Sequence, residues 1–95
     1  MVISILHFFI DLPDTQSLKD KRQIVKSAKD RLQTKFKCAV AEVGFQDSLR
    51  SAELGVAVLS NSRQFGESVM NKALNYIEKT VPGRIRDAEI FSEQY

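Results

Sequence analysis

The sequence has few of the residues that build metal centres, disulfides and flexible linkers. Its 95 residues include one Cys, one His, no Trp, four Gly and two Pro. A single thiol cannot form an internal disulfide, and one Cys with one His falls short of the ligands of a typical zinc site. We therefore expect a single domain over residues 1–95, without metal or cofactor, in a reducing cytoplasm. Cys38 is expected to be a small strand residue.

No segment is apolar over a membrane-spanning length. The longest apolar run, "VISILHFFI" at residues 2–10, is far shorter than the ~20 residues that a membrane helix needs. It also lacks the basic start and the cleavage site of a signal peptide. Because β-branched and aromatic residues occupy both of its faces, we expect a central β-strand here and no membrane partner.

Hydrophobic periodicity divides the chain into six elements. Ser17, followed by Asp20, resembles a capping box, and apolar residues then recur at helical spacing. We expect helices over 17–35 and 62–80, and strands over 2–10, 38–45, 52–60 and 84–92. The order β-α-β-β-α-β predicts an α+β ferredoxin-like sandwich. Its four-stranded antiparallel sheet should carry both helices on one face, with the first and third strands central.

The face of the sheet away from the helices is expected to be unusually apolar. Alternation along 2–10 places Ile3, Ile5, His7 and Phe9 outward, with Leu59 near them. Exposed apolar patches of this kind often mark partner surfaces. A homodimer through this face is therefore one hypothesis, and it makes the protein an interaction module that needs no nucleic acid.

Two activities that occur on similar folds need residues that this sequence does not contain. The RNA recognition motif stacks bases on aromatic residues of two strands, and "FFIDLP" fits the first of these. The strand "AELGVAVLS" that should supply the second contains no aromatic residue. The loop "DLPDTQ" has neither Gly nor Arg, which excludes the phosphate cradle of an acylphosphatase.

An acid–base pair of His7 and Glu42 is a third alternative. A hairpin near Asp47–Arg50 would set Glu42 opposite Gly55, with His7 one strand further on the same face. General acid–base catalysis also needs a substrate within hydrogen-bond reach, and no nucleophile, metal or phosphate loop accompanies the pair. We therefore favour partner binding for both residues and predict no enzyme activity.

The basic residues are concentrated in "SLKDKRQIVKSAKDRLQTKFK" at 17–37. This segment holds eight of the chain's 14 basic residues and only two acids, a net charge of +6 in a chain of +2. On a helical wheel Lys19, Arg22, Lys26 and Lys29 form one stripe beside the apolar side. Lys21 falls inside the apolar arc, so it must snorkel or meet a specific anion.

Helix stability alone does not favour this arrangement. The helix dipole disfavours cations in the first turn, where Lys19, Lys21 and Arg22 lie. A basic cluster at a helix N-terminus suits phosphate groups. A solvated helix face without an anionic partner remains the alternative. We predict that Lys19, Lys21, Arg22, Lys26 and Lys29 bind a nucleic acid, most plausibly structured RNA.

Three segments give the chain a resemblance to a known family. "SLKDKR" at 17–22, "VAEVGFQD" at 40–47 and "LGVAVLS" at 54–60 resemble, in order and spacing, the YlxP-like family of small bacterial proteins of unknown function. The similarity covers about residues 1–80. The matching positions are Ser17, Leu18, Lys19, Asp20, Lys21, Arg22, Glu42, Gln46 and Asp47.

The resemblance implies a ferredoxin-like fold in a cytoplasmic bacterial protein. It also implies a link to translation and ribosome maturation, so that ribosomal RNA or a ribosomal subunit becomes the expected partner. No catalytic residue follows from it. Glu42, Gln46 and Asp47 join His7 as candidate partner-binding residues. The segment "GFQDSLRSAEL" departs from the family, whose hairpin commonly carries a bulkier aromatic residue.

Overall fold

The computed structural model describes residues 1–95 and contains six elements in the expected order. The strands are β1 (Val2–Asp11), β2 (Ala39–Gly44), β3 (Ser51–Ser60) and β4 (Arg84–Gln94), and the helices are α1 (Leu18–Phe36) and α2 (Arg63–Thr80). The expected bounds were right to within one or two residues. Every strand pairing is antiparallel, in the order β2-β3-β1-β4.

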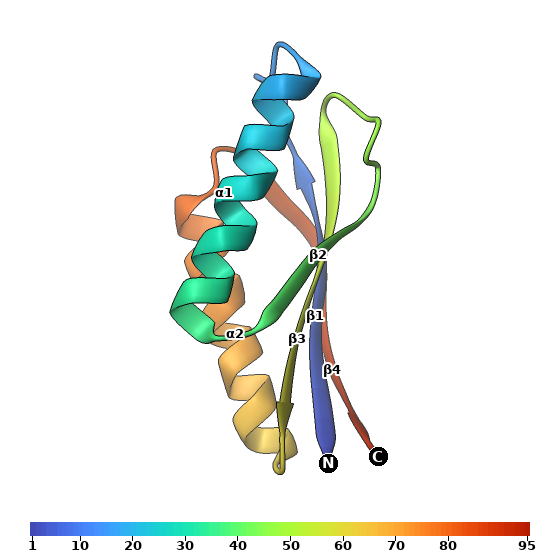
Figure 1. Cartoon of the computed structure of the whole chain (residues 1–95), viewed down its shortest axis with the longest axis vertical. Helices are drawn as coiled ribbons and strands as arrows, with labels where there is room; N and C mark the ends of the chain where they lie inside the picture. The colour runs from blue at the N-terminus through green and yellow to red at the C-terminus, as the bar shows by residue number, and fades with distance from the viewer.

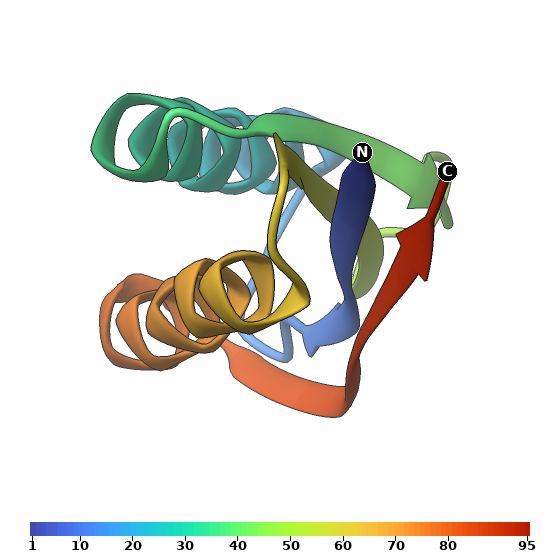
Figure 2. The same cartoon turned by 90° about the horizontal axis from the view of Figure 1, so that it is seen from below.

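The two helices lie side by side on one face of the sheet, and the other face is open (Figures 1 and 2). This confirms the ferredoxin-like α+β fold, with β1 and β3 in the centre. Both termini lie at the same end of the molecule (Figure 1). There the backbone N–H of Tyr95 donates to the carbonyl of Met1 at 2.7 Å, so β4 is paired to its end.

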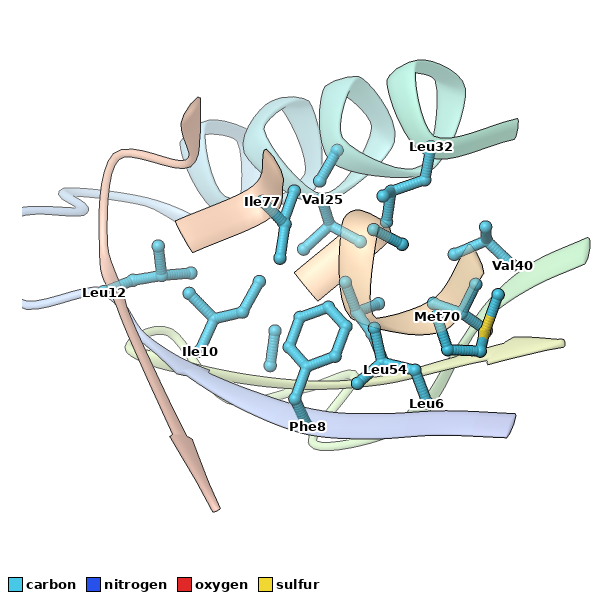
Figure 3. Close-up of a cluster of buried hydrophobic side chains, with 14 residues drawn as sticks. Leu6, Phe8, Ile10, Leu12, Val25, Leu32, Val40, Leu54, Met70 and Ile77 are labelled. Atoms are coloured by element: carbon cyan, nitrogen blue, oxygen red, sulfur yellow. The ribbon is translucent and has the colours of Figure 1, made fainter. Parts of the chain in front are cut away.

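Alternation along β1 separates the two faces as its sequence predicts. Leu6, Phe8 and Ile10 are fully buried, whereas the odd positions are only half-buried. Figure 3 shows the buried side chains of β1 and β3 pointing toward those of α1 and α2. Burying each large apolar side chain contributes about 1.5–3 kcal/mol, so this layer holds the helices on the sheet.

Two local irregularities shape the sheet edges. The β2–β3 pairing shifts by one residue between Glu42 and Gly44, and the β1–β4 pairing shifts between His7 and Phe9. Such bulges leave one residue unpaired and re-aim the side chains around it. The first of them changes the position of Glu42 and hence the candidate site.

Candidate nucleic-acid interface

Helix α1 carries the basic stripe and has defined caps at both ends. The hydroxyl of Ser17 accepts the N–H of Asp20 at 3.1 Å, as a capping box requires. The Asp20 carboxylate accepts the N–H of Gln16 at 3.3 Å, one residue before the usual partner. At the other end Lys37 is left-handed, and its N–H donates to Gln33 at 2.9 Å. These caps fix where α1 begins and where it ends.

Four of the five predicted RNA-binding residues lie on the flank of α1 away from its buried side. Lys19, Arg22 and Lys26 are exposed and Lys29 is half-buried. Lys26 forms an ion pair with Asp30 at 2.8 Å, and this hydrogen bond raises the pKa of Lys26. Lys19, Arg22 and Lys29 form no ion pair. We call Lys19, Arg22, Lys26 and Lys29 the basic stripe.

Lys21 does not belong to this stripe, and its assignment to a nucleic-acid surface was wrong. Its side chain is 1% exposed. The ammonium donates to the backbone carbonyl of Phe45, in the β2–β3 hairpin, and lies 3.2 Å from a carboxylate oxygen of Glu42. The anion that Lys21 meets is therefore a side chain of the same molecule. This is one of the two outcomes that the position of Lys21 inside the apolar arc left open.

Glu42 is likewise not available as a partner-binding residue on the outer face. It lies opposite Leu54, not Gly55, because of the bulge in β2. Its side chain consequently faces the helices. The oxygen nearest Lys21 accepts no hydrogen bond, so the contact is an ion pair that depends on Lys21 for compensation.

The other two hairpin candidates remain at the surface. Gln46 and Asp47 are exposed in the β2–β3 turn. The amide of Gln46 donates to the carbonyl of Glu42 at 3.4 Å. Phe45, just before them, has a φ of 58°, in the left-handed region. The bond from Lys21 to the Phe45 carbonyl therefore fixes the unusual backbone from which Gln46 and Asp47 project.

His7 lies on the outer face as expected, but its partner is Glu53. Its Nε2 is 2.7 Å from a carboxylate oxygen of Glu53, and the expected pair with Glu42 does not form. Gly44 makes room for this carboxylate, because a Cβ there would lie 2.1 Å from its other oxygen. The pairing depends on strand register, so the spacing of the sequence did not reveal it.

An aromatic and charged cluster surrounds this pair. The Phe9 ring contacts His7 and Phe45 edge-on, with centroids 5.2 and 5.9 Å away. Arg86 lies over the Phe9 ring at 4.6 Å. Its hydrogen bonds to Asp11 first, and then to Asp87, raise the pKa of Arg86. Sequence reasoning missed Arg86, because β4 showed only the pattern of a polar edge strand.

Several other features limit what the site can do chemically. No three His, Cys, Asp or Glu side chains lie together as metal ligands. Burial raises the pKa of the Cys38 thiol, which donates to the carbonyl of Leu32 at 3.4 Å. A raised pKa opposes thiolate formation and hence nucleophilic attack.

Neither helix is both long and apolar enough to cross a membrane.

Comparison with known proteins places these residues in a family. The family model described as "Protein of unknown function (DUF503)" matches residues 3–90. A curated relative, "Uncharacterized protein YlxP" of Bacillus subtilis (strain 168), is 35% identical over 65 residues. These cover 68% of this chain and 71% of the relative. The match confirms the resemblance that the three sequence segments indicated.

Proposed function

The chain belongs to the DUF503 family, whose description assigns no function, and we propose that it binds structured RNA through the basic stripe of α1. Ribosomal RNA is the proposed target. Lys21 takes no direct part. Its role is to hold the hairpin through Glu42 and Phe45.

One observation carries this proposal: three cations of the stripe have no ion-pair partner within the protein. Lys19, Arg22 and Lys29 form no ion pair, although acids occur elsewhere on the surface. Lys19 and Arg22 also occupy the end of α1 where the helix dipole opposes positive charge. An anionic polymer would compensate this unfavourable placement.

The expected mode of binding is contact with phosphates rather than reading of bases. The three unpaired cations, Lys19, Arg22 and Lys29, would neutralise three phosphates, so affinity should fall with salt at a logarithmic slope of about −2 to −3. Phosphate contacts position a protein but carry no sequence information. Specificity would then come from the shape of the RNA.

The test is co-sedimentation with ribosomal subunits over a salt series. We expect the combined variant Lys19→Glu, Arg22→Glu, Lys26→Glu to lose binding at all salt concentrations. The matched control reverses three exposed lysines elsewhere, Lys37→Glu, Lys72→Glu, Lys79→Glu, and should retain most of it. If the stripe variant keeps a native circular dichroism spectrum and sediments as the parent does, the proposal is wrong.

A second candidate function is self-association through the outer face of the sheet. Leu59 and Phe91 are 62% and 44% exposed there. On β1, Ile3, Ile5 and Phe9 form an outward ridge. Next to it, the positions of β2 and β3 that lie across from Ile5 and His7 are small residues, which are Ala39, Ala41, Gly55 and Ala57.

The ridge and these small residues lie on the same face. In two copies related by a two-fold axis, the ridge of each copy can therefore pack on the small residues of the other. Such an isologous contact is the commonest route to a dimer. Ile5→Asp should then convert a dimer to a monomer in analytical ultracentrifugation while RNA binding persists. Phe65→Asp, at an exposed apolar residue of α2, is the control. A monomeric parent at high concentration would contradict this candidate.

A further inference from the structure

A groove lies on the other flank of α1, where that helix faces α2. Its volume is about 740 Å³, within the roughly 300–1,000 Å³ of small-molecule sites. It is bounded by the loop after β1, the first two-thirds of α1, the end of α2 and the start of β4. Figure 1 shows the start of α1 and the end of α2 at the same end of the molecule.

The groove has an apolar floor. Ile24 and Ala28 of α1 line it together with Ile77 and Val81 at the end of α2. Ala28 and Ile77 are themselves buried, so the half-buried Ile24 and Val81 give most of the apolar surface of the floor. Eight polar or charged side chains surround this floor, among them Asp20, Arg31 and Arg84, so a ligand must supply polar groups that match them.

Two guanidinium groups line the groove without a partner. Neither Arg31 nor Arg84 forms an ion pair. Arg86, two residues further along the same strand, is paired with Asp11 and Asp87 instead. Each unpaired guanidinium retains five N–H donors in a geometry that suits planar oxyanions.

The charges of the groove are unevenly distributed along it. Its two acids, Asp14 and Asp20, lie at the end formed by the loop after β1. Arg31 is eleven residues beyond Asp20 on α1, a distance of about 16 Å along the helix. The acid next to Arg31, Asp30, is already bonded to Lys26. The Arg31 end therefore favours an anionic group.

We propose that this groove binds a small organic anion with an apolar body. The body lies over Ile24, Ala28 and Ile77, and a carboxylate, sulfonate or phosphate group is bound by Arg31. Arg84, at the other end, donates to a further acceptor of the ligand. This site is separate from the basic stripe, because no residue of the stripe lines the groove, and it does not depend on RNA binding.

The probe is 2-naphthalenesulfonate, with the neutral 2-naphthalenesulfonamide as its comparison. Both are titrated into the full ¹⁵N-labelled chain and followed by amide chemical shifts. We expect shifts at groove residues such as Ser27, Thr80 and Gly83. Because charge-assisted hydrogen bonds are about twice as strong as neutral ones, the sulfonate should bind about tenfold more tightly.

Three variants test the assignment of the residues. Arg31→Gln should weaken the sulfonate about tenfold and leave the sulfonamide unchanged. Ser27→Trp, at an exposed position that the added ring would use to fill the groove, should weaken both. Arg50→Gln, at an exposed arginine outside the groove, should change neither.

The proposal is overturned by either of two results. One is that the shifts cluster on the outer sheet face around Leu59 and Phe91, which would place the probe on that apolar surface. The other is that Arg31→Gln binds the sulfonate as the parent does, since the anion would then have another partner. The double variant Lys19→Glu, Arg22→Glu leaves the ion pair of Lys26 with Asp30 intact, so it should bind the probe normally, which separates this test from that of RNA binding.

Discussion

Lys21 and Arg22 are neighbours in the sequence, and the fold uses them in opposite ways. Lys21 points under α1 and is buried against Glu42 and the Phe45 carbonyl. Arg22 points away from the sheet, is exposed and has no ion-pair partner. The same type of charge therefore belongs to the architecture on one flank of the helix and to the candidate interface on the other. Substitution of Lys21 should therefore change stability, whereas substitution of Arg22 should change binding.

The largest expected effect comes from Lys21→Ala. Lys21 is buried but Glu42 is 19% exposed, so removing the ammonium should cost up to about 3 kcal/mol, the lower end of the range for fully buried pairs. Arg22→Ala should change the free energy of unfolding by less than about 0.5 kcal/mol, because it is a surface substitution. Urea denaturation followed by circular dichroism measures both.

A double variant distinguishes loss of the pair from loss of packing. Lys21→Met with Glu42→Leu replaces both charges by apolar groups, so most of the lost stability should return. Equal stability of Lys21→Ala and Arg22→Ala would contradict the contrast between the two flanks.

A smaller effect is expected at the N-terminal cap of α1. The Ser17 hydroxyl accepts the N–H of Asp20, and Ser17→Ala should lower the free energy of unfolding by about 1 kcal/mol. Thr34→Ala is the control, because Thr34 is an exposed α1 residue whose hydroxyl forms no hydrogen bond with the protein. If both variants unfold at the same urea concentration, the cap does not contribute to stability.

Burial of the Cys38 thiol, just after α1, should also make the free energy of unfolding depend on pH. Burial raises the pKa of this thiol above its ordinary value of 9.0. The folded state then holds its proton at a pH where the unfolded chain has lost it. This contribution to stability is complete below pH 9 and is lost as the pH rises through the folded pKa.

Alkylation by iodoacetamide at pH 8 should accordingly be slower for the folded protein than for the same protein in urea. The variant Cys38→Ala should show a weaker loss of stability between pH 9 and 10. Alkylation at the same rate in the folded and unfolded protein would mean that the thiol is not protected.

The sequence predicted most of the fold because its main signals are local. Alternation in β1 assigned Ile5 and Phe8 to opposite faces, and the helical stripe assigned Val25 and Leu32 to the core. The unusual position of Lys21 was also visible, although its partner was not. That partner comes from β2, 21 residues further along the chain.

The pairing register of the strands limited what could be predicted of the site from the sequence. A one-residue bulge in β2 moves Glu42 to the helix side, and a one-residue change reverses the face of every later side chain. The isolated Gly44 in "VAEVGFQD" is a local sign of a bulge, but it does not give the register of Glu42 before the pairing with β3 is known. The pair of His7 with Glu53, and the groove beside Arg31, depend on the same long-range packing.

The smallest change in stability, and the sharpest test of the interface, is Asp30→Asn. Asp30 neutralises Lys26 through an exposed i,i+4 ion pair, and such solvent-screened pairs contribute little to stability. Removing its charge frees Lys26 for a phosphate. RNA affinity should therefore rise at low salt, and the slope of its logarithm against salt should steepen by up to about 1. The measurement is fluorescence anisotropy with a ribosomal RNA fragment. Asp87→Asn, at an acid on β4 away from the stripe, should leave the slope unchanged. If Asp30→Asn weakens binding or has no effect, Lys26 does not contact the RNA, and the interface must be confined to Lys19, Arg22 and Lys29.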